Sequence, residues 1–141
     1  MKKLILSLLV AAFVGGNTLS AQTITKNEDG KYSLSVGHVT LTVDAQKGGK
    51  IVSYRYDDKE ILSQTKIPNS FGSTFWTSPQ SEWNWPPVPE YDTKPFNAEV
   101  AGDKLILTGE KSKRFGYRVR KELSTDKKDN AIVITYTIIN E

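Results

Sequence analysis

Apolar and polar residues alternate with a period of two along most of this chain, and this pattern constrains the fold more than any other feature. The alternation is clear in Tyr32 to Val36 and in His38 to Val43, and the longest such segment is Ala131 to Ile139. Successive side chains of a β-strand point to opposite faces, so the pattern is typical of strands with one buried face. Further strands are expected at 51–56, 60–63, 98–101, 104–108 and 117–123.

Turn signals separate these segments. Gly48-Gly49 permits positive φ, Asp57-Asp58-Lys59 indicates a hairpin turn, and Gly102-Asp103 is a two-residue hairpin signal. Gly37 indicates a bulge or a tight bend. No segment after the first 22 residues has a helical period, so the sequence predicts an all-β, antiparallel β-sandwich or half-sandwich over 31–141, after a polar leader at 22–30.

The first 21 residues have the features of a secretory signal peptide. Lys2 and Lys3 are followed by an apolar run from Leu4 to Val14, and Leu19-Ser20-Ala21 ends in a small residue suited to cleavage. The run is too short to span a bilayer. The expected mature protein begins at Gln22, is periplasmic or secreted, and has no membrane attachment after cleavage.

Composition excludes several classes of function. Without Lys2 and Lys3 the chain has 19 − 2 = 17 basic residues against 16 acidic ones, interspersed, which argues against a nucleic-acid partner. There is no cysteine, so disulfides and thiolate chemistry are excluded. The single histidine, His38, makes a poor metal site, and we expect no metal and no cofactor.

The segment Phe71 to Asp92 contains all three tryptophans and four of the six prolines. Proline fixes φ and removes a hydrogen-bond donor, so this segment is expected to be a stiff loop. In an exported protein such a loop suits either of two roles, stacking on sugar rings or closing the end of a β-sandwich. The residue pattern leaves both open.

For the first role, the ligand would be a mono- or oligosaccharide. The candidate ligand-binding residues are Trp76, Gln80, Glu82, Trp83, Trp85 and Tyr91, with Asn84 and Asp92 as further hydrogen-bonding groups. Both indoles of Trp83-Asn84-Trp85 would share one side if the segment is extended. The acids of the segment are Glu82, Glu90 and Asp92, but no spacing identifies a glycosidase pair, so no catalytic residue is assigned.

Two motifs resemble a known fold family. Gly48 to Tyr54 followed by Glu60-Ile61-Leu62, and Asn69 to Gln80 followed by Trp83 to Pro87, resemble a bacterial exported branch of the galactose-mutarotase-like supersandwich, over roughly Tyr32 to the C-terminus. The resemblance implies a carbohydrate-binding face on a large antiparallel sandwich. The catalytic Glu and His of mutarotases lie later than this sequence reaches, so no residue here corresponds to them.

The strand expected at 131–139 is followed only by Asn140-Glu141. At the edge of a sheet, such an apolar strand would be unprotected. The sequence is therefore expected to be the front part of a larger fold, with self-association through this strand when it stands alone; the alternative is that the strand pairs centrally in a complete small sandwich.

Three functions follow as hypotheses. They are a sugar-binding module, the N-terminal part of an aldose-epimerase-like or glycan-processing enzyme, and a structural or assembly module with the aromatic loop packed internally.

Overall fold

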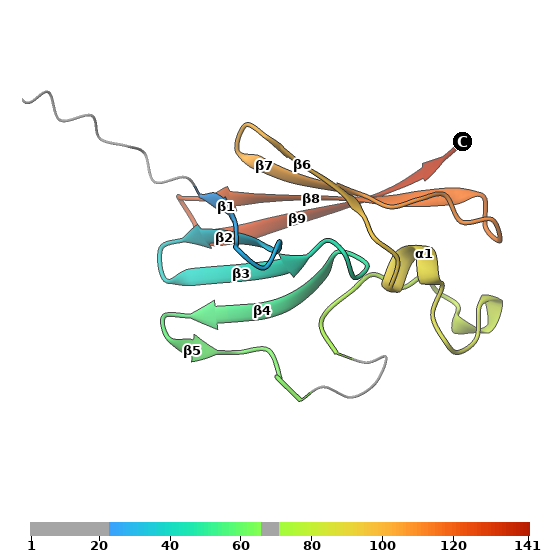
Figure 1. Cartoon of the computed structure of the whole chain (residues 1–141), viewed down its shortest axis with the longest axis horizontal. Helices are drawn as coiled ribbons and strands as arrows, with labels where there is room; N and C mark the ends of the chain where they lie inside the picture. Colours follow the sequence, from blue (N-terminus) through green and yellow to red (C-terminus); the bar gives the residue numbers. More distant parts are fainter. Residues whose placement is uncertain (1–22, 66–70) are drawn as a thin grey trace, which may run out of the picture.

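The computed structural model describes residues 23–65 and 71–141, and these fold into two antiparallel β-sheets (Figure 1). The all-β prediction is therefore confirmed. The expected signal peptide lies outside the described residues. Within the described ranges, no helix is long and apolar enough to cross a membrane.

The first sheet has the strand order β1-β2-β3-β4-β5. Its strands are β1 (Ile24–Lys26), β2 (Tyr32–Val36), β3 (Val39–Asp44), β4 (Lys50–Tyr56) and β5 (Lys59–Glu60). Gly37, with φ of +53°, lies in the tight turn between β2 and β3, as one of the two sequence interpretations expected. The β3–β4 register shifts between Thr42 and Val43.

The second sheet has the order β6-β7-β8-β9. Its strands are β6 (Asn97–Ala101), β7 (Lys104–Thr108), β8 (Tyr117–Asp126) and β9 (Ala131–Asn140). β9 lies at the edge of this sheet, so the alternative in which it pairs centrally is wrong for the described residues. Its one neighbouring strand there is β8.

The two sheets pack face to face, with β2 contacting β8 and β9. The alternating pattern explains the core between them, because one face of each strand is buried. The fully buried core residues include Leu34, Val43, Leu105, Leu107, Val119 and Leu123. Lys121 is an exception, since it occupies an inward position of β8 and is only 2% exposed.

The leader expected at 22–30 contributes a strand. Ile24 is buried and pairs with Leu34, so β1 extends the first sheet. The aromatic segment contains two short helical pieces, η1 (Gln80–Glu82) and α1 (Pro89–Asp92). α1 begins with proline, which is tolerated at the first helical position because its missing N–H has no partner there. α1 lies at the end of the sandwich away from the β4–β5 hairpin (Figure 1).

Candidate functional site

The three tryptophans form one cluster, which we call the aromatic platform (Trp76, Trp83 and Trp85). Trp76 contacts both of the others, with ring centroids 5.9 Å from Trp83 and 5.8 Å from Trp85, the latter edge to face. Aromatic rings at these distances attract one another through their quadrupoles. The cluster therefore holds its rings in defined orientations.

Trp83 anchors the platform to the core. It is 6% exposed, and its indole Nε1 donates a hydrogen bond to the Thr77 carbonyl at 2.9 Å. Asn84, next in sequence, has φ of +58°, so the segment is not extended here. As a result Trp83 and Trp85 differ in exposure, and the condition for both indoles to share one side is not met.

Trp76 and Trp85 remain open to solvent, at 45% and 52% exposed. The Nε1 of Trp76 donates to Asp92 Oδ1 at 3.0 Å, which fixes the indole through its polar edge. Half-exposed rings held in this way keep a large apolar surface in contact with water.

The other candidate residues divide into two groups. Gln80 and Glu82 lie on η1 with exposed side chains, and the Glu82 backbone carbonyl accepts a hydrogen bond from Arg114. Tyr91 is 1% exposed, stacks on Tyr117 and donates its hydroxyl to the Tyr117 carbonyl at 3.1 Å. Burial raises the pKa of the Tyr91 hydroxyl. The ring of Tyr91 is thus part of the core and presents no face to a ligand.

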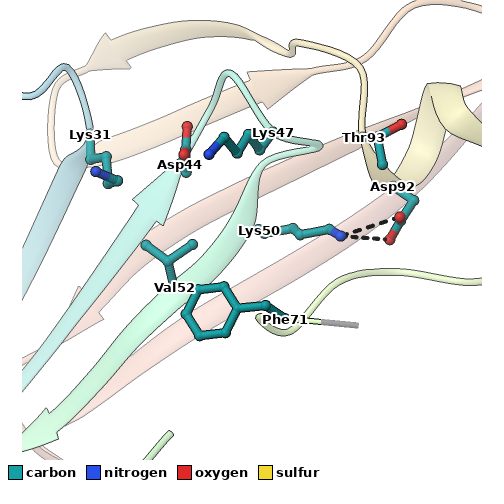
Figure 2. A pocket seen from close by; sticks show the side chains of 8 residues that line it. All are labelled: Lys31, Asp44, Lys47, Lys50, Val52, Phe71, Asp92 and Thr93. Atoms are coloured by element: carbon teal, nitrogen blue, oxygen red, sulfur yellow. Dashed lines mark hydrogen bonds and ion pairs between the residues drawn. The ribbon is translucent and has the colours of Figure 1, made fainter. Parts of the chain in front are cut away.

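A pocket of about 460 Å³ lies beside Asp92, the residue that holds Trp76. We call it the lysine pocket, and it is lined by Lys31, Asp44, Lys47, Lys50, Val52, Phe71, Asp92 and Thr93 (Figure 2). Its volume falls in the range of small-molecule sites. Polar and charged groups converge on it from the first sheet and from α1.

The Lys50–Asp92 ion pair closes one side of this pocket (Figure 2). Lys50 Nζ lies 3.2 Å from Asp92, and the two side chains are only 10% and 1% exposed. Because Asp92 also accepts from Trp76, its carboxylate links the pocket to the aromatic platform. A buried carboxylate needs such partners, since an unpaired buried charge is strongly unfavourable.

The turn before β4 positions this pair. Gly48 packs directly against the Asp92 backbone, where an added Cβ would lie 2.0 Å from the Asp92 carbonyl oxygen. Beneath it, Lys121 Nζ donates to the carbonyls of Gly48 and Gly49 at 2.8 and 3.0 Å. Burial lowers the pKa of Lys121 to about 8, an effect that Asp92 opposes and Lys50 reinforces.

Three further charged residues line the pocket, namely Lys31, Asp44 and Lys47. Lys31 pairs with Asp29 outside the pocket, and the Asp44 carboxylate accepts the Gln46 backbone N–H at 3.0 Å. Lys47 forms no ion pair within the described part of the chain. Lys47 is exposed and is therefore the charged group of the lining most available to a ligand, whereas Asp44 is only 7% exposed.

The acids of the aromatic segment have structural partners. Lys94 forms ion pairs with both Glu90 and Glu110. Burial raises the pKa of Glu90, but the hydrogen bond from Lys94 and the nearby positive charges outweigh burial and leave this pKa below its usual value. Asp92 is held by Lys50 and Trp76. A general acid needs a raised pKa, so the ionised Glu90 does not suit that role.

His38, in the β2–β3 turn, is exposed, stacks on Tyr56 and lies 2.6 Å from an oxygen of Asp57, a residue of the turn between β4 and β5. No group of three potential metal-binding side chains occurs among the residues that the structure describes.

Sequence reasoning missed Lys50, Lys121, Asp44 and Lys47. Lys50 follows the Gly48-Gly49 turn and Lys121 interrupts the apolar face of a strand, which is the signal that marks a buried charge. The partners of Lys50 and Lys121 lie 42 and 73 positions away in sequence, so pattern alone does not identify them.

No family model, no curated protein and no solved structure matches the chain.

Proposed function

We propose that this chain is an exported carbohydrate-binding module with a sandwich of galactose-mutarotase type, non-catalytic as it stands. One observation carries the proposal, namely that the half-exposed Trp76, against which the half-exposed Trp85 packs, hydrogen-bonds Asp92 in the lining of a polar pocket. Sugars combine an apolar ring face with a rim of hydroxyls. A binding site therefore combines an aromatic face with hydrogen-bonding groups.

In this proposal Trp76 and Trp85 contact the sugar and Trp83 supports them. Gln80 and Glu82 are exposed on η1, which directly precedes Trp83, and they supply further hydrogen bonds at the rim. The exposure of two of the three indoles favours this function over a module whose aromatic loop packs only internally.

The lysine pocket supplies the polar half of the site. Lys47 donates and the exposed hydroxyl of Thr93 accepts, which suits the alternating donor and acceptor roles of neighbouring hydroxyls. The Lys50–Asp92 pair, already satisfied internally, forms a rigid wall. Lys47, which is exposed and has no ion pair among the described residues, also suits a sugar that carries a carboxylate.

A titration of the mature protein with neutral hexoses, hexuronates and oligosaccharides tests the proposal, with tryptophan emission as readout. The Trp85→Ala variant should weaken binding by roughly 1–3 kcal/mol, by analogy with bases stacked on aromatic side chains. Trp85 suits the test because no described side-chain hydrogen bond depends on it.

Tyr56→Ala is the matched control. Tyr56 is 54% exposed, close to the 52% of Trp85, but lies at the far end of β4 against His38. This variant should bind as the unchanged protein does. Equal loss of binding in both variants, or no emission change with any glycan, would contradict the proposal.

A further inference from the structure

The second sheet ends in an edge strand, β9, that lacks the usual protection. It is ten residues long, contains no charged residue and no proline, and its register with β8 is unbroken. Natural edge strands are generally short, charged, bulged or covered, because their free N–H and C=O groups can pair with another chain. β9 has none of the protections that sequence or register provides.

The other edge strands of the described fold are different. β1 and β5 have three and two residues and carry Lys26 and Lys59-Glu60, and β6 has five residues with Glu99 at its centre. Each is therefore short and charged. The contrast within one molecule indicates that β9 has a different role from the other edges.

Both faces of β9 leave apolar side chains in water. Val133 on the outer face is 45% exposed. Tyr136 and Ile138 pair with the inward residues Lys121 and Val119, so they lie on the core face, and yet they are 39% and 54% exposed. The first sheet does not cover this end of the core face.

An apolar cleft adjoins the same strand. It has a volume of about 340 Å³ and is lined by Leu41, Ile51, Tyr54, Leu62, Ser73, Ile132 and Ile134. The lining comes from the first sheet, the segment after it, and β9. A strand added beside β9 would form main-chain hydrogen bonds at the edge and place its inward side chains over this cleft.

We propose that β9 pairs antiparallel with β9 of a second copy of this chain, about a two-fold axis. Self-pairing suits an uncharged strand, because no like charges meet across the interface. This pairing joins the four-stranded sheet of one copy to the four-stranded sheet of the other, which gives one sheet of eight strands with a continuous core face.

Side-chain chemistry selects the register. In antiparallel pairs, residues directly opposite share a face, so a two-fold axis must pass beside one residue. An axis at Tyr136 pairs Ile134 with Ile138, Val133 with Ile139, and Thr135 with Thr137. Such β-branched and Thr–Thr pairs are favourable.

The neighbouring register, with the axis at Thr135, would pair Val133 with Thr137 on the outer face, where the axis at Tyr136 pairs Val133 with Ile139. The second pairing places two apolar β-branched side chains opposite each other, which favours the Tyr136 axis. A two-fold axis closes the assembly at two copies.

The test is the mass of the mature chain in solution, measured by light scattering after gel filtration over a concentration series. We expect a dimer. Val133→Lys should shift it to a monomer with unchanged circular dichroism, because an edge lysine opposes pairing. Val100→Lys is the matched control, since Val100 is 42% exposed on the other edge of the same sheet, and it should stay dimeric.

Single cysteines test the register, because the chain has none of its own. A mixture of Thr135→Cys and Thr137→Cys proteins should oxidise to the mixed dimer, and neither alone should crosslink efficiently. The proposal would be overturned if the unsubstituted protein is a monomer, forms open-ended aggregates, or pairs only with an added apolar peptide. It would also be overturned if the Val133→Lys variant remains a dimer. Self-crosslinking of Thr135→Cys alone would overturn the register.

Discussion

Gly48 should be among the positions of this fold least tolerant of substitution, because two separate constraints act on it. Its φ of +68° lies in the left-handed region, and a Cβ there would be 2.0 Å from the Asp92 carbonyl oxygen and 2.3 Å from the Asp92 carbonyl carbon. Both neighbours are backbone atoms, so no rotamer change relieves the overlap. Ordinary van der Waals contact begins at 3.4 Å, so the turn and the Asp92 backbone would have to move apart by 3.4 − 2.0 = 1.4 Å.

The two terms can be estimated separately. The left-handed conformation costs a residue with a Cβ about 1–2 kcal/mol. Overpacking that forces the backbone to move adds about 1–3 kcal/mol. Gly48→Ala should therefore lower the free energy of unfolding by about 2–5 kcal/mol, measured by urea denaturation.

The Gly102→Ala variant isolates the cost of the left-handed conformation from the cost of overpacking. Gly102 has φ of +62°, close to that of Gly48, but no atom lies within 4 Å of its added Cβ. This variant should lose about 1–2 kcal/mol only. If the two variants lose the same stability, the close approach of the β3–β4 turn to α1 does not constrain the fold and the reasoning about Asp92 fails.

Further outcomes can be checked on the same protein. Tyr91→Phe should lose about 1 kcal/mol of stability in urea denaturation, because it removes the hydrogen bond to the Tyr117 carbonyl, and Tyr56→Phe, at an exposed position, should lose almost none. Burial lowers the pKa of Lys121 from 10.5 to about 8, so the unfolded chain binds more protons than the folded one between these values. The free energy of unfolding should then rise by about 2 kcal/mol from about pH 7.5 to about pH 9.5, and Lys121→Met should abolish that rise; a rise that survives in the variant would assign it to another group. Polarimetry of freshly dissolved glucose or galactose should show no catalysed ring opening, because the single histidine, His38, is exposed and has Asp57 and Tyr56 as its contacts rather than the tryptophans.

Local patterning accounts for most of the sheets. The alternation in Tyr32 to Val36 and in Lys104 to Thr108 predicts strands with the observed bounds, because each strand buries one face on the core. β1 was missed since three residues, Ile24–Lys26, are too short to show a period. Its place depends on pairing with β2, which no local pattern encodes.

The candidate site was only partly predictable. Composition marked Trp76 and Trp85 as aromatic faces, but the burial of Trp83 and Tyr91 depends on hydrogen bonds to Thr77 and Tyr117 carbonyls. The Lys50–Asp92 pair joins residues 42 positions apart. This contact comes from how α1 packs against the turn before β4, and spacing along the sequence does not reveal it.

Binding of a sugar to the aromatic platform is most directly tested by glycan titration of the mature chain with calorimetric detection, comparing the unchanged protein with Trp76→Phe and Trp85→Ala. Trp76→Phe keeps a ring but loses the hydrogen bond to Asp92, whereas Trp85→Ala removes a half-exposed ring altogether. The account predicts saturable binding of at least one sugar class, weakened in both variants and most strongly in Trp85→Ala. Binding that is unchanged in both variants, or absent for every glycan while the protein is folded, would contradict it.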